Sequence, residues 1–107
     1  MDNRKEPREK KSIKVRIKDE DGIYPASVIT ISKTGISVRT NQVFPAYKMV
    51  DILVKVAQQL IPIRGSVRWV NEIPGTDGEK LYEVGFLLKS PPPEYVQHFD
   101  WVPGKLV

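Results

Sequence analysis

Residues 13–40 read IKVRIKDEDGIYPASVITISKTGISVRT, and this stretch decides the fold class. Apolar and polar residues alternate over 13–17, which is the two-residue period of a half-buried strand. The Asp-Gly pair at 21–22 then supplies a hairpin turn, and a second run rich in β-branched residues follows it. After the tight turn at 33–35, a third alternating run begins. Short strands joined by short turns predict an antiparallel sheet.

The same pattern continues almost to the end of the chain. Further alternating runs occur at 50–56, 61–69 and 82–88, with a Pro-Gly loop at 74–78 before the last of them. Six strands without helices between them predict an all-β fold, a six-stranded antiparallel β-barrel. The alternation places the following side chains inside: Ile29, Ile31, Val50, Ile52, Val54, Val56, Val67, Trp69, Tyr82, Val84 and Phe86.

The two ends of the chain differ from this body. Residues 1–18 contain eight of the seventeen Lys and Arg residues, a net charge of +5, whereas the other 89 residues sum to −1. We expect residues 1–11 to form a flexible basic N-terminal arm, because they contain too few apolar residues to offset the entropy of ordering. Residues 12–107 then form a single barrel domain. A short helical segment at 94–102, after three prolines, is expected to cap one barrel end rather than to bind a partner.

Several classes of function are excluded by composition. The chain has no cysteine and one histidine, His98, which removes disulfides, thiol nucleophiles, cysteine zinc sites and most histidine triads. The acidic run at 19–21 lies in a turn and lacks the ligand spacing of a calcium loop. We therefore expect no enzyme, metal or cofactor. The apolar runs are too short to span a membrane and no secretory signal is seen, so we expect a cytoplasmic protein.

Two groups of residues suggest a ligand site. Arg4 and Arg8 lie four residues apart in the basic arm, and guanidinium groups pair well with phosphate oxygens or with the edge of guanine. Thr30 and Ser32 lie two apart at the end of the second strand, so their side chains share a face. Gly35 permits a positive φ or the close approach of a flat ligand. The alternative is an ordinary β-turn in which Ser32 bonds to the local backbone.

Taken in order, these groups resemble the motifs of the PilZ domain family. That family has RxxxR in an N-terminal arm and [D/N]xSxxG at the end of the second barrel strand. The runs GSVRWV at 65–70 and YEVGF at 82–86 resemble the family's fifth and sixth strands. The resemblance covers about residues 4–100 and implies a barrel that acts as a receptor for cyclic di-GMP, a bacterial second messenger.

The resemblance also implies a role for each motif residue. Arg4 and Arg8 would clamp the ligand, Ser32 would contact it, and Gly35 would permit its close approach. Thr30 stands where the family has Asp or Asn, which implies a weaker contact with guanine by about 1–3 kcal/mol. The arm is expected to close over the ligand and to alter a surface for a downstream partner, which the sequence does not identify.

Two other functions remain as alternatives. One is a degenerate PilZ domain that acts without nucleotide as a protein-interaction adaptor, for example in pilus or motility machinery. The other is a small OB-like barrel that binds single-stranded nucleic acid. The latter requires exposed aromatic side chains on which bases stack. The expected inward positions of Trp69, Tyr82 and Phe86 argue against it, so no nucleic-acid polymer is expected as a partner.

Overall fold

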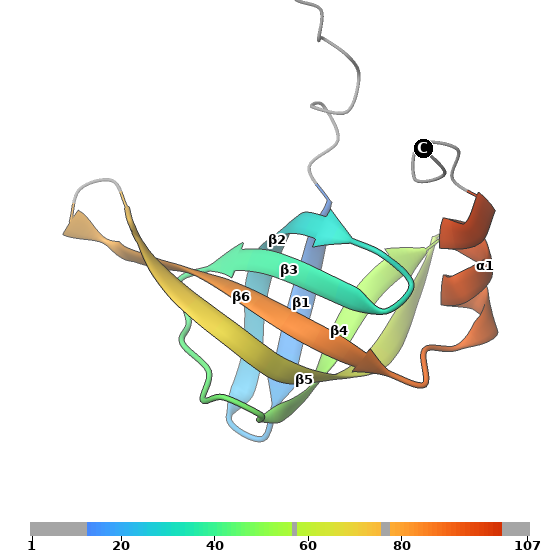
Figure 1. Cartoon of the computed structure of the whole chain (residues 1–107), viewed down its shortest axis with the longest axis horizontal. Coiled ribbons are helices and arrows are strands. Elements are labelled where there is room, and N and C mark those ends of the chain that lie inside the picture. Colours follow the sequence, from blue (N-terminus) through green and yellow to red (C-terminus); the bar gives the residue numbers. More distant parts are fainter. Residues whose placement is uncertain (1–12, 57, 76–77, 102–107) are drawn as a thin grey trace, which may run out of the picture.

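Six antiparallel strands close into a barrel, and one helix lies at its end (Figure 1). The computed structural model describes residues 13–56, 58–75 and 78–101, with side chains as far as Gln97. The strands close in the order β1-β2-β3-β6-β5-β4, which confirms the predicted fold class. Their bounds, with that of the helix, are β1 Lys14–Asp19, β2 Gly22–Ile31, β3 Gly35–Thr40, β4 Met49–Val56, β5 Gln59–Pro74, β6 Lys80–Lys89 and α1 Pro93–Trp101.

The barrel interior follows from strand alternation, because every second side chain of a strand points to the same face. β4 shows this most simply, with Val50, Ile52, Val54 and Val56 all buried, as predicted. β4 pairs with β1 and with β5 in unbroken register, so Ile52 lies level with its neighbours Ile17 and Ile63. Aliphatic side chains from opposite walls thus fill the interior.

Two β-bulges interrupt this regularity on the other side of the barrel. In the β2–β3 pair the extra residue is Ile29, and in the β5–β6 pair it is Arg68. A bulge shifts the side-chain alternation by one position. The predicted inward positions of Ile29 and Trp69 are therefore wrong, since these side chains are 41% and 45% exposed. The register beyond the β2 bulge brings Ile31 back to the inner face, as predicted.

The helix α1 covers one end of the barrel, beside β4 and the β2–β3 turn (Figure 1). Its Tyr95 is fully buried in the core, and the Tyr95 hydroxyl donates a hydrogen bond to the backbone carbonyl of Ser32. This agrees with the expected helical cap at 94–102. The rest of the expected helical segment, from residue 98 on, lies outside the described side chains.

The predicted basic arm, residues 1–11, also lies outside the described residues. Within the part that the structure describes, no helix is long and apolar enough to cross a membrane.

Candidate functional site

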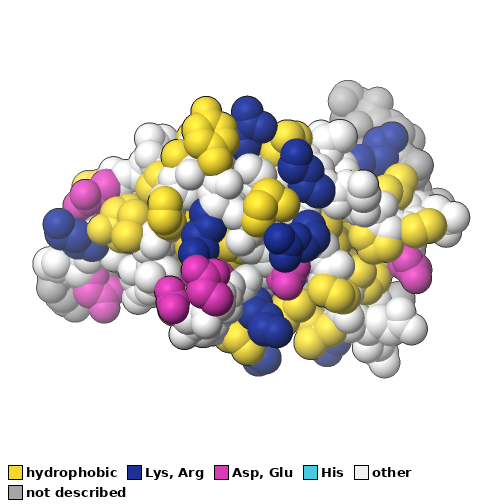
Figure 2. All heavy atoms as spheres, turned by 90° about the horizontal axis from the view of Figure 1, so that it is seen from below, with side chains coloured by type: hydrophobic (Ala, Val, Ile, Leu, Met, Phe, Trp, Pro, Cys, Tyr) yellow, Lys and Arg dark blue, Asp and Glu magenta, His cyan; other side chains and the backbone are white. Residues whose placement is uncertain are grey.

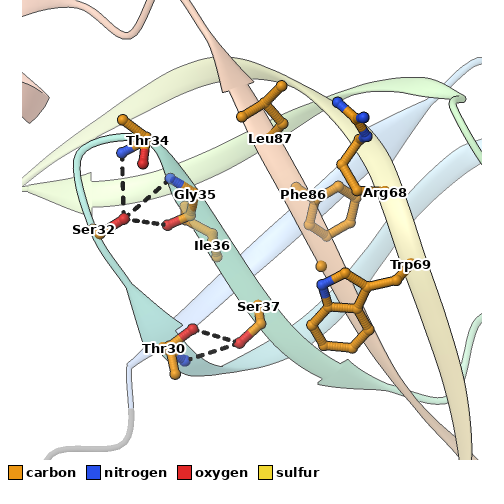
Figure 3. Close-up of a pocket in the computed structure, with 11 residues that line it drawn as sticks. Thr30, Ser32, Thr34, Gly35, Ile36, Ser37, Arg68, Trp69, Phe86 and Leu87 are labelled. Carbon is orange, nitrogen blue, oxygen red and sulfur yellow. Dashed lines mark hydrogen bonds between the residues drawn. The ribbon is translucent and has the colours of Figure 1, made fainter.

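A shallow pocket of about 300 Å³ opens on the outer face of β3, β6 and β5, next to the end of β2 (Figure 3). The predicted residues Thr30, Ser32 and Gly35 all line it. Arg68 and Trp69 approach from the opposite side, on β5 (Figure 3). The fold thus brings the strand-end motif beside two β5 residues that lie more than thirty positions away along the chain. We call this hollow the Trp69 pocket.

Ser32 organises the turn between β2 and β3. Its Oγ accepts hydrogen bonds from the backbone amides of Thr34, at 3.3 Å, and Gly35, at 3.2 Å (Figure 3). The Ser32 amide in turn donates to the Gly35 carbonyl at 2.9 Å. The local β-turn considered from the sequence is therefore present. It gives the rim of the pocket a defined shape, because the hydroxyl fixes two backbone amides.

Thr30 points outward from β2, as predicted, but its hydroxyl has a partner within the protein. Thr30 Oγ1 and Ser37 Oγ lie 2.6 Å apart, and the Thr30 amide donates to the same oxygen at 3.2 Å. Ser37 is 8% exposed, so this pair is partly shielded from water. A ligand that used the Thr30 hydroxyl would share it with Ser37.

Gly35 allows β3 to lie close to β6, and it does not adopt an unusual backbone conformation. A Cβ at this position would lie 3.2 Å from the Phe86 carbonyl oxygen, which is tighter than ordinary packing. Among the described glycines, only Gly78 has a positive φ. The glycine therefore lets the start of β3 lie close against β6 at the floor of the pocket.

Trp69 is the main feature that the sequence prediction missed. Because of the bulge, it pairs with Gly85 and its side chain extends over the outer face of β6. A Cβ on Gly85 would lie 2.2 Å from the indole Nε1, so the ring occupies the space that this glycine leaves. Aromatic cover of a glycine on a neighbouring strand is a known stabilising arrangement. A glycine at an outward position of β6 was the available sequence signal.

Arg68 adds positive charge at the rim of the pocket. Its guanidinium carbon lies 5.4 Å from the centre of the Tyr47 ring, a distance typical of a cation–π contact. Tyr47 itself is 69% exposed and has a positive φ of 67°. Among the described residues, no acidic side chain lines the Trp69 pocket. The site therefore combines an aromatic surface, hydroxyl groups, backbone amides and one cation, which suits an anionic ligand with a flat ring.

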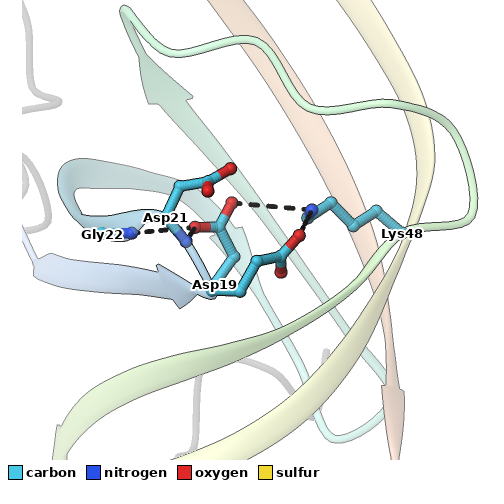
Figure 4. Close-up of polar contacts among 5 residues, drawn as sticks. Asp19, Asp21, Gly22 and Lys48 are labelled. Atoms are coloured by element: carbon cyan, nitrogen blue, oxygen red, sulfur yellow. Dashed lines mark hydrogen bonds and ion pairs between the residues drawn. The ribbon is translucent and has the colours of Figure 1, made fainter.

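The acidic turn at 19–21 is a separate feature, in which Lys48 lies beside the carboxylates of Asp19 and Glu20 (Figure 4). Asp19 Oδ1 accepts the amides of Asp21, at 2.8 Å, and Gly22, at 3.1 Å. Lys48 Nζ lies 2.7 Å from Glu20 Oε2, and this hydrogen bond lowers the pKa of the Glu20 carboxyl and raises the pKa of Lys48. In the described part of the chain, no cluster of three metal-ligating side chains occurs.

The inward positions expected for Trp69, Tyr82 and Phe86 argued against binding of single-stranded nucleic acid. This argument must be corrected in part. Phe86 is buried and Tyr82 packs against the core, but Trp69 is exposed and available for stacking. Arg4 and Arg8, the predicted clamp, lie outside the described residues, so their position relative to the Trp69 pocket stays a prediction.

Comparison with known proteins gives a family match and matches to solved structures. The PilZ domain family matches residues 2–100. The MrkH protein of K. pneumonia matches in two structures, with TM-scores of 0.68 and 0.67 at 17% and 16% sequence identity. The second of these structures is of the apo state. The matches cover 83% and 94% of this chain but only 42% and 50% of MrkH, so the chain spans half of that protein or less. At this identity the likeness shows the fold alone. A search of the curated proteins finds no match.

Proposed function

The chain belongs to the PilZ domain family, and from this premise we propose that it is a receptor domain for cyclic di-GMP in bacterial signalling. One observation carries the proposal: the motif residues Thr30, Ser32 and Gly35 line a pocket that also holds an exposed indole. A dinucleotide presents flat guanine bases and two phosphates. The pocket offers an aromatic surface on which a base can stack and a cationic rim that can pair with the phosphates.

In the proposed mode, a guanine base lies against the outer face of the Trp69 indole. The ring is already held over Gly85, so little conformational freedom is lost when a base stacks on it. Gly35 and the turn fixed by Ser32 offer backbone close to the base edge. Arg4 and Arg8 close over the phosphates, so that the N-terminal arm forms part of the binding site when the ligand is bound. Phosphate contacts of this kind weaken as salt is added.

Titration calorimetry with cyclic di-GMP tests this function. We expect saturable heat from the wild-type chain and none from Arg8→Ala, with an unchanged melting temperature of the free protein. Lys10→Ala is the matched control, because it removes a positive charge from the same arm without touching the motif. A wild-type chain that is silent with cyclic di-GMP overturns the proposal. A large loss of melting temperature in Arg8→Ala would instead assign the arm a structural role.

A second candidate function is an adaptor domain that works through protein contacts without nucleotide. The specific observation in its favour is that the Thr30 and Ser32 hydroxyls already have partners within the chain. The calorimetric titration separates the two candidates, since an adaptor gives no heat with cyclic di-GMP or with a linear dinucleotide control.

A further inference from the structure

A second concave surface lies on the opposite side of the barrel from the Trp69 pocket. It is a groove of about 590 Å³ over the outer faces of β1 and β4, with β2 and β5 at its sides. In Figure 1 these two strands run behind β3 and β6, and they are far from both in the closed strand order. We call this surface the β1–β4 groove. None of the described residues assigned to the ligand site lines this groove.

The groove combines cationic and apolar side chains in two rows across the strands. One row runs from Pro25 through Arg16 to Leu53, as the β1–β2 and β1–β4 registers show. In the next row Lys55 of β4 pairs with Leu60 of β5. Leu60 is 56% exposed, which is unusually open for a leucine that lies beside a concavity. No acidic side chain of the described part of the chain lines the groove.

Some cations of the described surface are paired with carboxylates, whereas those of the groove, like Lys18 and Lys89 elsewhere on that surface, are not. Arg39, Arg64 and Lys48 each have an acidic partner within 3.3 Å. Figure 2 shows a face of this kind, where Lys and Arg side chains in the middle lie against Asp and Glu side chains. In the part of the chain that the structure describes, the groove cations have no ion pair. They are Lys14, Arg16 and Lys55.

Two of these cations face one another. Val15 of β1 pairs with Val54 of β4 in an antiparallel register, so the next outward positions, Lys14 and Lys55, lie opposite each other. Like charges at facing positions of a sheet destabilise it. An anion placed between them removes this repulsion and gains two charge-assisted contacts. The arrangement therefore favours an acidic ligand over an empty surface.

We propose that the β1–β4 groove binds an acidic segment of a partner protein, one that carries a bulky apolar side chain between carboxylates. The carboxylates pair with Lys14, Arg16 and Lys55, and the apolar side chain covers Leu53 and Leu60. A discrete segment fits better than an anionic membrane, because the surface is hollowed rather than flat. The groove faces away from the Trp69 pocket, so ligand and partner can be held at once.

Selection from a random peptide library displayed on phage tests the proposal without knowledge of the partner. The bait is the full chain, in the absence of cyclic di-GMP. We expect enriched peptides that carry two or more Asp or Glu residues flanking Leu, Phe or Trp. Their binding should weaken roughly fivefold or more in Lys55→Glu, which exchanges an attraction for a repulsion. Leu60→Ser should weaken it by about the same factor through lost apolar contact.

Two variants on other surfaces serve as matched controls. Lys80→Glu changes the same charge on an exposed strand position, and Val43→Ser removes an equally exposed apolar side chain. Both should leave peptide binding unchanged. No enrichment, enrichment of peptides without acidic residues, or equal binding by Lys55→Glu overturns the proposal. Binding to phosphatidylglycerol vesicles that is lost in Lys55→Glu also overturns the proposal, because the groove would then bind a membrane. A dimer that is lost in the same variant overturns it as well, because the groove would then bind a second copy of the chain.

Discussion

The two sides of the barrel differ in how regularly their strands pair. On the β1–β4 side the register is unbroken, and inward and outward residues alternate without exception from Lys14 to Ile17 and from Met49 to Val56. On the opposite side, each of the pairs β2–β3 and β5–β6 contains a bulge. Both bulges adjoin the Trp69 pocket, because Thr30 follows one, Trp69 follows the other, and both residues line the pocket. Both sides contribute buried side chains to the core, and the irregular side also has bulges that place side chains where a ligand can reach them.

The largest expected effect comes from the regular side. Ile52 is fully buried between β1 and β5, so Ile52→Ala leaves a cavity in the core and should lower the free energy of unfolding by about 3 kcal/mol. Urea unfolding followed by far-UV circular dichroism measures this. Leu60→Ala on the neighbouring strand is the control and should stay within about 0.5 kcal/mol of wild type, because Leu60 is exposed. Equal losses in the two variants would contradict the buried position of Ile52 and the exposed position of Leu60.

The next largest effect is expected on the irregular side, where substitutions should change the affinity for cyclic di-GMP. Trp69→Ala removes the aromatic surface, and we expect it to weaken cyclic di-GMP binding by about 2 kcal/mol, roughly thirtyfold. Gly85→Ala should also weaken binding, since the new methyl group displaces the indole that lies 2.2 Å from its position. Calorimetry on both variants measures the change. An unaltered affinity in Trp69→Ala would remove Trp69 from the ligand site.

Tyr95 connects the two sides, because it lies in the core and bonds to the Ser32 carbonyl at the pocket rim. Tyr95→Phe should lower the free energy of unfolding by about 1 kcal/mol at neutral pH. Burial raises the pKa of Tyr95. The unfolded chain therefore ionises first, and wild-type stability is complete below pH ~10 and declines as pH rises above it.

The phenylalanine variant lacks this ionisation, so the difference between the two proteins should shrink and then reverse in sign at alkaline pH. Urea unfolding at several pH values from neutrality to about 11 tests the expectation. A difference that stays constant over the whole series would contradict it.

The smallest effect is expected at Thr30. Thr30→Asn supplies an amide oxygen that can accept from the guanine donor edge, which should tighten cyclic di-GMP binding by up to about 1 kcal/mol. The structure reduces the expected gain, because the substitution also breaks the Thr30–Ser37 contact of 2.6 Å. Thr30→Asn combined with Ser37→Ala removes that second effect and should show the larger gain. Weaker binding in both variants would mean that Thr30 does not meet the guanine edge.

The sequence predicted the regular side fully and the irregular side in part. Two-residue alternation suffices for β4, where Val50, Ile52, Val54 and Val56 are buried as expected. It fails at Ile29 and Trp69, because one extra residue in a strand exchanges the two faces and alternation alone carries no sign of it. The motif residues Thr30, Ser32 and Gly35 were found from chemistry and spacing. Arg68 and Trp69 were missed because their approach to the motif depends on the pairing of β5, β6 and β3, which is a long-range property.

Barrel closure leaves the far end of β5 with a strand neighbour on one side only. β5 pairs with β4 as far as Ser66 but with β6 as far as Pro74, so residues 68–74 have an open edge among the described strands. An open edge is where another chain can add as a further strand and begin to aggregate. Here the edge starts at a bulge, carries the charge of Glu72 and ends in a proline, three features that oppose such addition. The bulge that turns Trp69 outward thus also protects the folded protein from strand-to-strand association.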